Sequence, residues 1–588
     1  MAYFQALGDF LRYLESAGEL RRISAEVDSK LEVTEIATRA LKENLPAVLF
    51  ENVKGSKFPL AVNVYASARR IELALGRHPQ QIGEELIGFA EEMMPPRPRT
   101  VWKHRRLVAK AFLGRPRIGS HAISQEVAST DTLDQLPIQT CWPGDGGRFI
   151  TLGQVVTYDP LDGKRNIGIY RMQVYDGQTT GMHWQIQKGG GFHYHKAGKM
   201  GRDLEVAVAL GTDPATLLAS VAALPEGMDE ALFAGFLRGK ASRFTRGRSV
   251  SIAVPSGAEF ILEGTVRQSE RRKEGPFGDH FGHYSHAAPF PVFHMSAMTH
   301  RQDPVYPGTV VGIPPMEDRF LGNATQEILG PLAKMLHKEV RDVWAYYEAG
   351  FHNLLVVSVE ERYRKEAMKA ALGLLGTGQL SLTKCLILVS EEVDPRNWNA
   401  VLGSLRAHFD PHYDFVLLPK VPLDTLDFTS FVMELGSKMI LDATSKQDRP
   451  AGKKTRAPNA KEIRLIDRRI LDVAVMGETF VLVKVHGGGR QVVEKLVKNR
   501  KTAPASVVAV VSEDVDIHDQ ENSIWGVFTR FDCERDIVFS EQKMIGISPV
   551  YKGTMGIDAT WKKGYPDPLR MDDRIIRKVD SRWSEYWK

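Results

Sequence analysis

A pattern that recurs in the last third of the chain constrains the fold most. Three segments return in the same order, Leu355–Val359 as Val481–Val485, Val389–Asp394 as Val511–Asp516, and Met439–Thr444 as Met555–Thr560. Three ordered matches predict a duplicated α/β module, joined by the basic, proline-containing stretch 446–461 as a linker. Thr554 stands where the first copy has Lys438, so we expect any functional contact from the first copy and a packing or assembly role for the second.

The segment Glu274-Gly-Pro-Phe-Gly-Asp279 places two carboxylates five positions apart around residues that cannot form regular helix. Proline fixes one φ and the two glycines free others, so the loop is stiff in one place and sharply bent elsewhere. Such a loop can turn Glu274 and Asp279 toward one point, which separates their pKa values and leaves one carboxyl protonated near neutrality. The pattern therefore favours a general-acid site, while an acidic turn that caps a strand is the plainer interpretation.

The segment Arg165–Gln173 follows a turn at Asp159–Gly163 and has the character of a half-buried strand. Asn166 and Arg171 face opposite ways on an ideal strand, so a bulge or a bend at Gly168 is needed to bring them to one site. Asn offers a neutral oxygen to a hard cation, and Arg offers a planar fork to a carboxylate.

The remaining patterns place helices and strands along the chain. Residues 3–22 predict an amphipathic helix, and Ala47–Val53 predicts a strand in a small α/β region. From 120 to 315, short apolar runs broken by glycine and proline favour a β-barrel. After Leu321, strands at 354–359 and 385–389 flank a helical stretch from 364 to 375, which is typical of an α/β module.

Composition excludes several classes of protein. A chain of 588 residues with 43% hydrophobic and 25% charged residues is typical of a globular protein with several domains. It has no apolar run of about 18 residues and no secretory signal pattern at Met1–Gly8, so we expect a cytoplasmic location. The three cysteines are far apart and match no metal spacing or disulfide framework.

Charge is uneven along the chain although the net charge is only +5. Residues 96–117 carry eight Lys or Arg and no acid, with Trp102 and Phe112 interleaved. A solvated helix face, a contact between subunits or a surface that meets an anionic membrane or partner explains this better than nucleic-acid binding, which the small net charge argues against. The glycine-rich Val485–Arg490 lacks the ending of a phosphate loop and is interpreted as a turn, with His486 exposed.

Six motifs carry a family resemblance, in consistent order between residues 1 and 446. They are the two segments around Arg171 and Glu274, together with Leu136–Pro143, Gly181–Lys188, Val254–Gly264 and Gly436–Thr444. In this set the chain resembles the UbiD family of decarboxylases that depend on prenylated FMN. The resemblance implies a split β-barrel of flavin-binding type between an N-terminal and a C-terminal α/β region. We expect domains at 1–119, 120–320 and 321–450, with the linker and duplicated module at 451–588.

The resemblance also implies roles for individual residues. Arg171, Glu274 and Asp279 match the family's catalytic network, with Asp279 as the proton donor. Metal ligands for Mn²⁺ or Mg²⁺ match Asn166 and Glu230, and K⁺ is a further candidate ion. Flavin contacts fall on Ile169, Tyr170, Arg171, His183, Trp184, Gln185, Lys188, Gly189 and Lys438.

One position departs from the family pattern. Many relatives carry His where this chain has Gln187, and in some of them that His is a further metal ligand. The Gln187 carbonyl oxygen still suits Mn²⁺ or Mg²⁺, so we keep it as a candidate ligand. His193 and His195 are a rival pair of ligands, although His-X-His on a strand is also how two histidines share an exposed face.

The resemblance implies a reversible, non-oxidative decarboxylase of an aromatic acid, with a flavin prenyltransferase that supplies the cofactor and a homo-oligomeric state. The stretches 189–195 and 310–325 look like the branch assigned to menaquinone biosynthesis through futalosine, which implies a dihydroxynaphthoate. A 4-hydroxy-3-polyprenylbenzoate of ubiquinone biosynthesis is the alternative, followed by a catabolic aromatic acid. A non-catalytic subunit of a larger carboxylase is the alternative class, which loss of the acids or of Arg171 would indicate; neither is lost.

Overall fold

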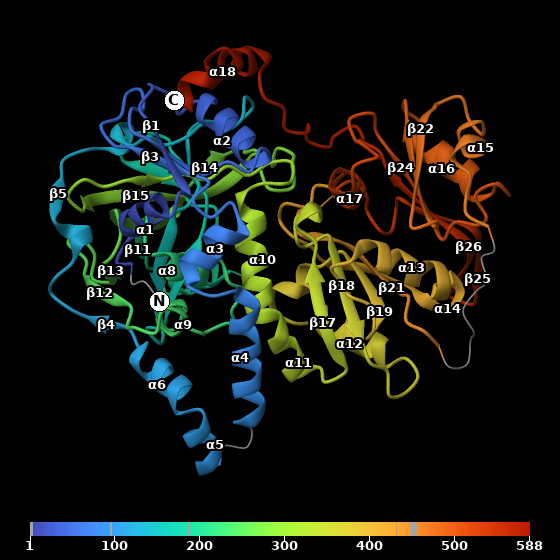
Figure 1. The fold of residues 1–588 in the computed structure, drawn as a ribbon, viewed down its shortest axis with the longest axis horizontal. Coiled ribbons are helices and arrows are strands. Elements are labelled where there is room, and N and C mark those ends of the chain that lie inside the picture. The colour runs from blue at the N-terminus through green and yellow to red at the C-terminus, as the bar shows by residue number, and fades with distance from the viewer. Residues whose placement is uncertain (1–3, 94–96, 186–187, 431, 447–455, 588) are drawn as a thin grey trace. The chain divides into compact units, whose positions relative to one another are not determined.

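The computed structural model describes residues 4–587 except 94–96, 186–187, 431 and 447–455. The chain forms two compact units (Figure 1). Unit 1 comprises Met1–Ile328 and Asp567–Lys588, and unit 2 comprises Leu329–Pro566. The sequence did not predict that residues 567–588 return to unit 1, and the finer division into four domains stays a prediction.

Unit 1 begins with an α/β region. Its sheet has the order β1-β2-β3-β16, with β1 Leu20–Ile23, β2 Ala47–Phe50, β3 Leu60–Val62 and β16 Tyr306–Pro307. Its helices are α1 Leu7–Ser16, α2 Glu32–Lys42, α3 Ala68–Leu75, α4 Pro79–Glu92, α5 Pro98–Lys103 and α6 Arg105–Leu113. The helix predicted over 3–22 is too long, because Gly18 takes a left-handed φ of 74° and the chain continues as β1.

The central sheet of unit 1 carries Asn166 and Ile169 on β8 and Glu274 at the end of β14. Its path is β10-β15-β14-β11-β7-β8, from Thr179–Gly181 through Ala288–His300, Phe260–Glu274, Leu204–Leu210 and Gln154–Tyr158 to Arg165–Ile169, and β5 Val127–Ser129 pairs with β15. The path stays open, as a split barrel does. The further helices of unit 1 are α7 Gly189–Lys199, α8 Pro214–Val221, α9 Glu230–Arg238, α10 Glu317–Leu329 and α18 Asp573–Tyr586.

Short elements complete unit 1. They are the small sheet of β13 Ala253–Pro255, β12 Arg243–Arg246 and β4 Arg117–Ile118, the pair β6 Phe149–Ile150 and β9 Met172–Gln173, and the 3₁₀ turns η1 Ile123–Gln125 and η2 Leu133–Gln135. The strand proposed for His193 and His195 is wrong: these residues lie on α7. Gly190, His193, Tyr194 and Ala197 are its buried residues, which is helical spacing.

Unit 2 contains the predicted duplication. Its first sheet has the order β17-β18-β19-β21-β20, formed by Val340–Ala345, Leu354–Val359, Cys385–Ser390, Leu435–Asp442 and Phe415–Pro422. Its second sheet has the order β22-β23-β24-β26-β25, formed by Ile470–Met476, Phe480–Val485, Val507–Val511, Ser548–Ala559 and Ile537–Ile545. In both sheets the outer pairs are antiparallel and the inner two are parallel.

Each copy has its own helices and its own core. The helices of the first are α11 Ala333–Leu336, α12 Glu366–Leu374, α13 Trp398–His408 and α14 Pro411–Asp414, with 3₁₀ turns η3 Gly330–Leu332, η4 Tyr347–Ala349 and η5 Gly378–Leu382. The helices of the second are α15 Ala460–Arg464, α16 Gly489–Val497 and α17 Gln520–Phe528. Val481, Val483, Val508 and Val510 all lie in a second core, as the repeat predicts.

Matching positions in the two copies have matching roles. Asp442 accepts hydrogen bonds from the backbone and the hydroxyl of Thr444, and Asp558 accepts the same two from Thr560. Lys365 and Gly488 each lie directly before a helix, and both residues have a φ of 66°. The topology and these contacts together confirm the duplicated module.

Candidate active site

Arg171 lies between the two carboxylates of the 274–279 loop, as the sequence predicts. Its Nε donates to Glu274 Oε1 at 3.0 Å, its Nη1 donates to Asp279 Oδ2, and its Nη2 donates to Ser285 Oγ at 3.0 Å. The guanidinium also stacks over Phe277, with its carbon 4.8 Å from the ring centre. Each of the three guanidinium nitrogens therefore donates a hydrogen bond within unit 1.

The break in the strand after Ile169 brings Arg171 to this cluster. The Tyr170 ring folds back over Gly168, where an added Cβ would come within 2.7 Å of Tyr170 Cε2. Strand β8 ends at Ile169 and β9 begins at Met172, so Arg171 lies between strands. The bend that the sequence predicts near Gly168 is thus a strand break after Ile169. Glycine is needed at 168 because a side chain there would collide with the Tyr170 ring.

Glu274 is fully buried at the end of β14. Its Oε1 also lies 3.0 Å from His183 Nδ1, while no described residue bonds its Oε2. Burial alone would raise the pKa of Glu274, but the charge of Arg171 and the hydrogen bond to His183 outweigh it and lower that pKa. Burial lowers the pKa of His183 itself, with Arg171 acting in the same direction.

Asp279 is 7% exposed. Its pKa is lower than the sequence reasoning suggested. Burial would raise its pKa, but His280, which donates from its backbone at 2.7 Å and lies with Nδ1 2.6 Å away, acts with Arg171 to hold the pKa of Asp279 well below its usual range. The expectation that one of the paired acids stays protonated near neutrality is therefore wrong. At Asp279 the contacts with His280, together with the charge of Arg171, outweigh the effect of burial.

Three residues of this region escaped the sequence reasoning. His280 and Ser285 directly contact Asp279 and Arg171, and their closeness to the loop in sequence is a signal that could have found them. Burial raises the pKa of Asp318 to about 6, with His280 acting in the opposite direction. Nothing in the local sequence around Asp318 indicates that it lies near His280.

A second cluster surrounds the N-terminus of α7. An added Cβ on Gly189 would lie 2.0 Å from Asn166 Oδ1, and one on Gly190 would lie 2.6 Å from Trp184 Nε1. The Gly190 amide donates to Tyr170 Oη at 3.2 Å. Among the described residues, neither Asn166 Nδ2 nor Trp184 Nε1 has a hydrogen-bond partner although both atoms are buried. The predicted Asn166, Tyr170, Trp184 and Gly189 are thus neighbours, with polar atoms ready for a ligand.

Glu230, the first residue of α9, contacts β8. Its Oε2 accepts the backbone amide of Ile167, the residue after Asn166, at 3.0 Å. Burial raises the pKa of Glu230 to about 7. A nearby cation would lower this raised pKa and keep the Glu230 carboxylate ionised. Asn166 and Glu230 therefore fit a hard divalent ion.

The other predicted ligands are placed differently. Gln187 lies outside the described residues. Ile169, Gln185 and Lys188 are partly exposed, and Lys188 is the residue before α7. His193 is buried with Nδ1 2.9 Å from Thr157 Oγ1, whereas His195 is exposed. No group of three His, Cys, Asp or Glu that could hold a metal occurs in the part of the chain that the structure describes. A metal here would therefore depend on amide oxygens such as that of Asn166.

Lys438 is buried in unit 2, where backbone carbonyls accept hydrogen bonds from its ammonium group. Its Nζ donates to the carbonyls of Ser381 and Thr383, both at 2.8 Å. Thr554 does the same in the second copy, donating to Thr502 O at 3.4 Å and Ala505 O at 3.1 Å. These matched contacts give Lys438 a structural role in its own unit, and its cofactor contact stays a prediction.

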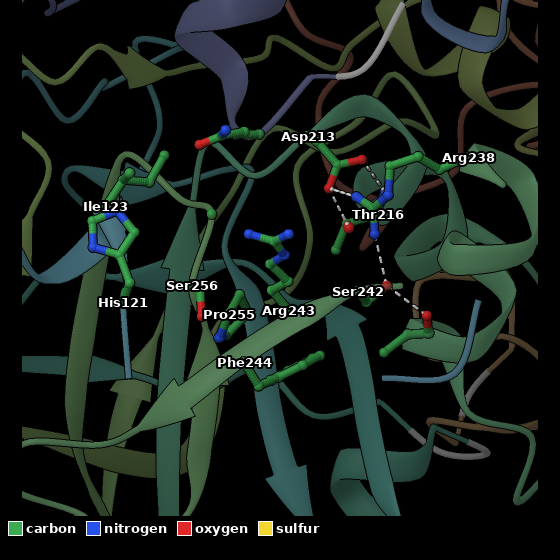
Figure 2. A pocket seen from close by; sticks show the side chains of 13 residues that line it. His121, Ile123, Asp213, Thr216, Arg238, Ser242, Arg243, Phe244, Pro255 and Ser256 are labelled. Atoms are coloured by element: carbon green, nitrogen blue, oxygen red, sulfur yellow. Dashed lines mark hydrogen bonds and ion pairs between the residues drawn. The ribbon is translucent and has the colours of Figure 1, made fainter. Parts of the chain in front are cut away.

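A hollow elsewhere in unit 1 contains none of the predicted site residues. It lies between α8, α9 and β12 and is lined by Asp213, Arg238, Ser242, Arg243 and Ser256, among others (Figure 2). Figure 2 shows Arg238 beside Asp213, an ion pair that fills one side of the hollow. The acids and the cradle at α7 therefore remain the candidate active site.

Comparison with known proteins supports this choice. Three family models match the chain: the N-terminal domain of 3-octaprenyl-4-hydroxybenzoate carboxy-lyase at residues 11–89, its Rift-related domain at 118–314, and its C-terminal domain at 319–443 and 463–559. An uncharacterized protein of Archaeoglobus fulgidus is 43% identical over 474 residues, covering 80% of this chain and 98% of that protein. A Chlamydia pneumoniae protein named as a subunit of 4-hydroxybenzoate decarboxylase is 34% identical and covers 97% of both chains.

Solved structures agree with these matches. Vanillic acid decarboxylase of Sedimentibacter hydroxybenzoicus superposes with a TM-score of 0.68 at 27% identity, covering 78% of this chain and 96% of that one. The UbiD-class enzyme HmfF of Pelotomaculum thermopropionicum, in complex with FMN, gives 0.63 at 27% identity, with 77% and 97% covered. The fold and the family models define a carboxy-lyase. The chain belongs to the UbiD family.

Proposed function

We propose that the chain is a decarboxylase of an aromatic acid that uses prenylated FMN. The observation that carries the proposal is the Arg171 cluster, in which one guanidinium holds two buried carboxylates inside a family whose members are carboxy-lyases. The alternative of a non-catalytic subunit predicts loss of one of these three groups, and all three are present and in contact. A solved HmfF structure contains prenylated FMN, which supports the same cofactor here.

The cradle at α7 is the proposed cofactor site. Backbone amides at the start of α7, Tyr170 and Trp184 would hold a flavin phosphate, and Asn166 with Glu230 would hold Mn²⁺ or Mg²⁺ against it. When bound, the prenylated flavin supplies the electron sink for loss of carbon dioxide. Gln187 and K⁺ are further candidates for the ion site, and a flavin prenyltransferase is the proposed source of the cofactor.

The chain's own residues position the acid and deliver a proton. Loss of carbon dioxide from a carboxylate leaves a carbon that must take up one proton. We assign Asp279 as the group that transfers it. Because the pKa of Asp279 is lowered, the proton must be loaded onto it first, and His280 Nδ1, 2.6 Å from Asp279 Oδ1, is placed to supply it. Arg171 fixes the orientation of both carboxylates.

Substitution of Asp279 tests the assignment. Asp279→Asn keeps the shape and removes the acid, so we expect turnover to fall by about two to four orders of magnitude while flavin binding is largely kept. Ser296 is an exposed residue on β15 of the same sheet, so Ser296→Ala is the control and should leave turnover unchanged. Turnover of the Asp279 variant close to that of the wild type would exclude the acid role.

A dihydroxynaphthoate of menaquinone biosynthesis is the proposed substrate, with a 4-hydroxy-3-polyprenylbenzoate and a catabolic aromatic acid as the alternatives. Relatives support only the wider class, since the solved neighbours act on different aromatic acids. Comparing metabolites of a deletion strain identifies the acid that accumulates. Restored turnover of that acid by the purified protein, co-expressed with a flavin prenyltransferase, completes the test.

We also propose that the holoenzyme is a cytoplasmic homo-oligomer that meets an anionic membrane through α5 and α6. None of the helices in the described part of the chain combines the length and apolar composition of a membrane span. Trp102 is 72% exposed, Phe112 is 61% exposed and Ile118 is 68% exposed. No residue of α5 is buried, and α6 buries only Leu107. Eight cations and no acid between 96 and 117 suit an anionic bilayer, and they oppose a two-fold contact of this surface with itself.

Vesicle binding tests this surface. We expect the holoenzyme to sediment with vesicles containing phosphatidylserine, less at high salt, and Trp102→Ser with Phe112→Ser to weaken this binding. Ile547→Ser removes an apolar side chain of unit 2 that is even more exposed, at 97%, and is the control. If the double variant instead reduces the mass of the oligomer and leaves vesicle binding intact, the surface is a contact between subunits.

A further inference from the structure

The chain returns to the Asp279 loop after it has completed unit 2. Tyr284 donates its backbone amide to Asp567 O at 3.2 Å, and Leu569 donates its own to Gly282 O at 3.0 Å. His283 and Pro568 form an antiparallel bridge between these two bonds. Residues 567–569 thus pair with residues 282–284 as a short extra strand, within unit 1.

The same segment packs against the residue that precedes Asp279. Leu569 is almost fully buried. An added Cβ on Gly278 would lie 2.2 Å from Trp142 Cδ1 and 2.9 Å from Leu569 Cδ2, so the backbone at Gly278 is enclosed between these two side chains. The Gly278 amide donates to Asp145 Oδ1 at 2.8 Å. With Leu569 on one side and Trp142 on the other, the backbone before Asp279 has one arrangement available.

Helix α18 anchors the segment to the N-terminal region. Glu32 on α2 is buried, and its carboxylate accepts hydrogen bonds from Lys578 at 2.8 Å, Arg582 at 2.7 Å and Tyr586 at 2.7 Å. Arg39 of the same helix α2 pairs with Asp580. Because α18 begins at Asp573, only a few residues separate this anchor from Leu569.

We propose that residues 567–569 are a positioning element of the active site, with Leu569 as its central residue. The element holds the 278–285 loop so that the Asp279 carboxylate faces Arg171 and His280. Leu569 touches neither the substrate nor the cofactor and acts through Gly278. The inference deepens the proposed function and rests on it for the role of Asp279, but the coupling between segment and loop stands on the contacts alone.

Hydrogen–deuterium exchange of the full-length protein tests the coupling. The Tyr284 amide donates to Asp567 O, and the Ser285 amide donates to Phe277 O within the loop. In Leu569→Ala we expect both amides to exchange on the order of tenfold faster, because both bonds open locally once Leu569 no longer holds the loop. Amides of β11, in the centre of the sheet, should exchange as in the wild type. Arg574→Ala on α18, which loses only a local pair with Asp572, is the matched control and should leave the loop unchanged.

Kinetics test positioning. In the holoenzyme we expect kcat of Leu569→Ala to fall by about tenfold to a hundredfold with KM unchanged, since a displaced acid slows the chemical step. Leu569→Met, which restores the volume, should recover both rate and exchange. Leu569→Val should give an intermediate effect, and it serves if the alanine variant does not fold.

Specific outcomes overturn the inference. Wild-type exchange at Tyr284 and Ser285 in folded Leu569→Ala or Leu569→Val shows that the segment does not hold the loop. A rise in KM that equals the fall in kcat/KM, or a loss of rate in Arg574→Ala as large as that in Leu569→Ala, also contradicts positioning. If the wild-type protein decarboxylates none of the acids offered, the proposed function fails, while the exchange result still decides whether the segment holds the loop.

Discussion

Replacing Arg171 with methionine removes the positive charge that two buried carboxylates share. Glu274 is fully buried and Asp279 nearly so, and Met fills a similar volume without donating a hydrogen bond. Breaking a buried ion pair by removing one partner costs about 3–5 kcal/mol. At about 2 °C per kcal/mol for a unit of this size, the melting transition of unit 1 should fall by about 6–10 °C at neutral pH.

The loss should depend on pH in a defined direction. In the wild type the pKa of Glu274 is lowered, so its stabilising contribution is present above the unfolded pKa of about 4.3 and is lost as pH falls below it. Without Arg171, burial raises the folded pKa of Glu274 instead, and the penalty grows with pH by up to about 1.4 kcal/mol per unit until that raised pKa is passed, while His280 still lowers the pKa of Asp279. Arg171→Met should therefore be more destabilised at pH 8 than at pH 5.

Calorimetry of the full chain across pH 5–8 measures this effect, because the two units can melt separately. Arg12→Met is the control, since Arg12 is an exposed arginine of unit 1 that pairs with Asp9 on the surface, and it should shift the transition little. A shift for Arg171→Met no larger than that of Arg12→Met, or one equal at pH 5 and pH 8, would refute the electrostatic account of this cluster.

Three further substitutions test other parts of the account. Glu230→Ala should release both divalent metal and flavin, measured by elemental analysis and absorbance; full flavin without metal in the variant would exclude a metal ion that links the protein to the flavin phosphate. In the wild type, metal affinity should fall as pH drops below about 7, where Glu230 becomes protonated. Lys438→Met leaves the carbonyls of Ser381 and Thr383 without their donor, so we expect a loss of about 1–3 kcal/mol in unit 2, seen by calorimetry, with flavin content unchanged; loss of flavin would restore a cofactor role. Leu482→Ala empties a buried position in the second copy and should cost about 2–5 kcal/mol by calorimetry without loss of flavin; flavin loss from a folded variant would contradict a purely structural second copy.

The sequence predicts the parts of the fold that depend on local pattern. The strand at Leu354–Val359 begins and ends where its apolar run does, and the repeat foretells the shared topology of the two sheets. The prediction fails where packing overrides local pattern. Residues 189–199 contain four glycines and an alternating His pair, yet they form α7 because one face of that helix is buried.

The candidate site shows the same division. Arg171, Glu274 and Asp279 could be named from motifs, but the charge state of the two acids could not. Whether Asp279 holds a proton depends on how many cations surround it, and His280 and Arg171 reach it through folding. The role of Lys438 was also out of reach, because the carbonyls of Ser381 and Thr383 that it binds carry no side-chain signal.

The return of residues 567–588 to unit 1 has a consequence for how the protein is made. A ribosome completes the Asp279 loop early, but it adds Leu569 and α18 only after all of Leu329–Pro566 has emerged. At about 5–20 residues per second, the loop waits for tens of seconds without the strand that pairs with it. Unit 1 of a nascent or prematurely terminated chain therefore exposes the surface that Leu569 would cover, which makes such chains a target for chaperones until synthesis ends.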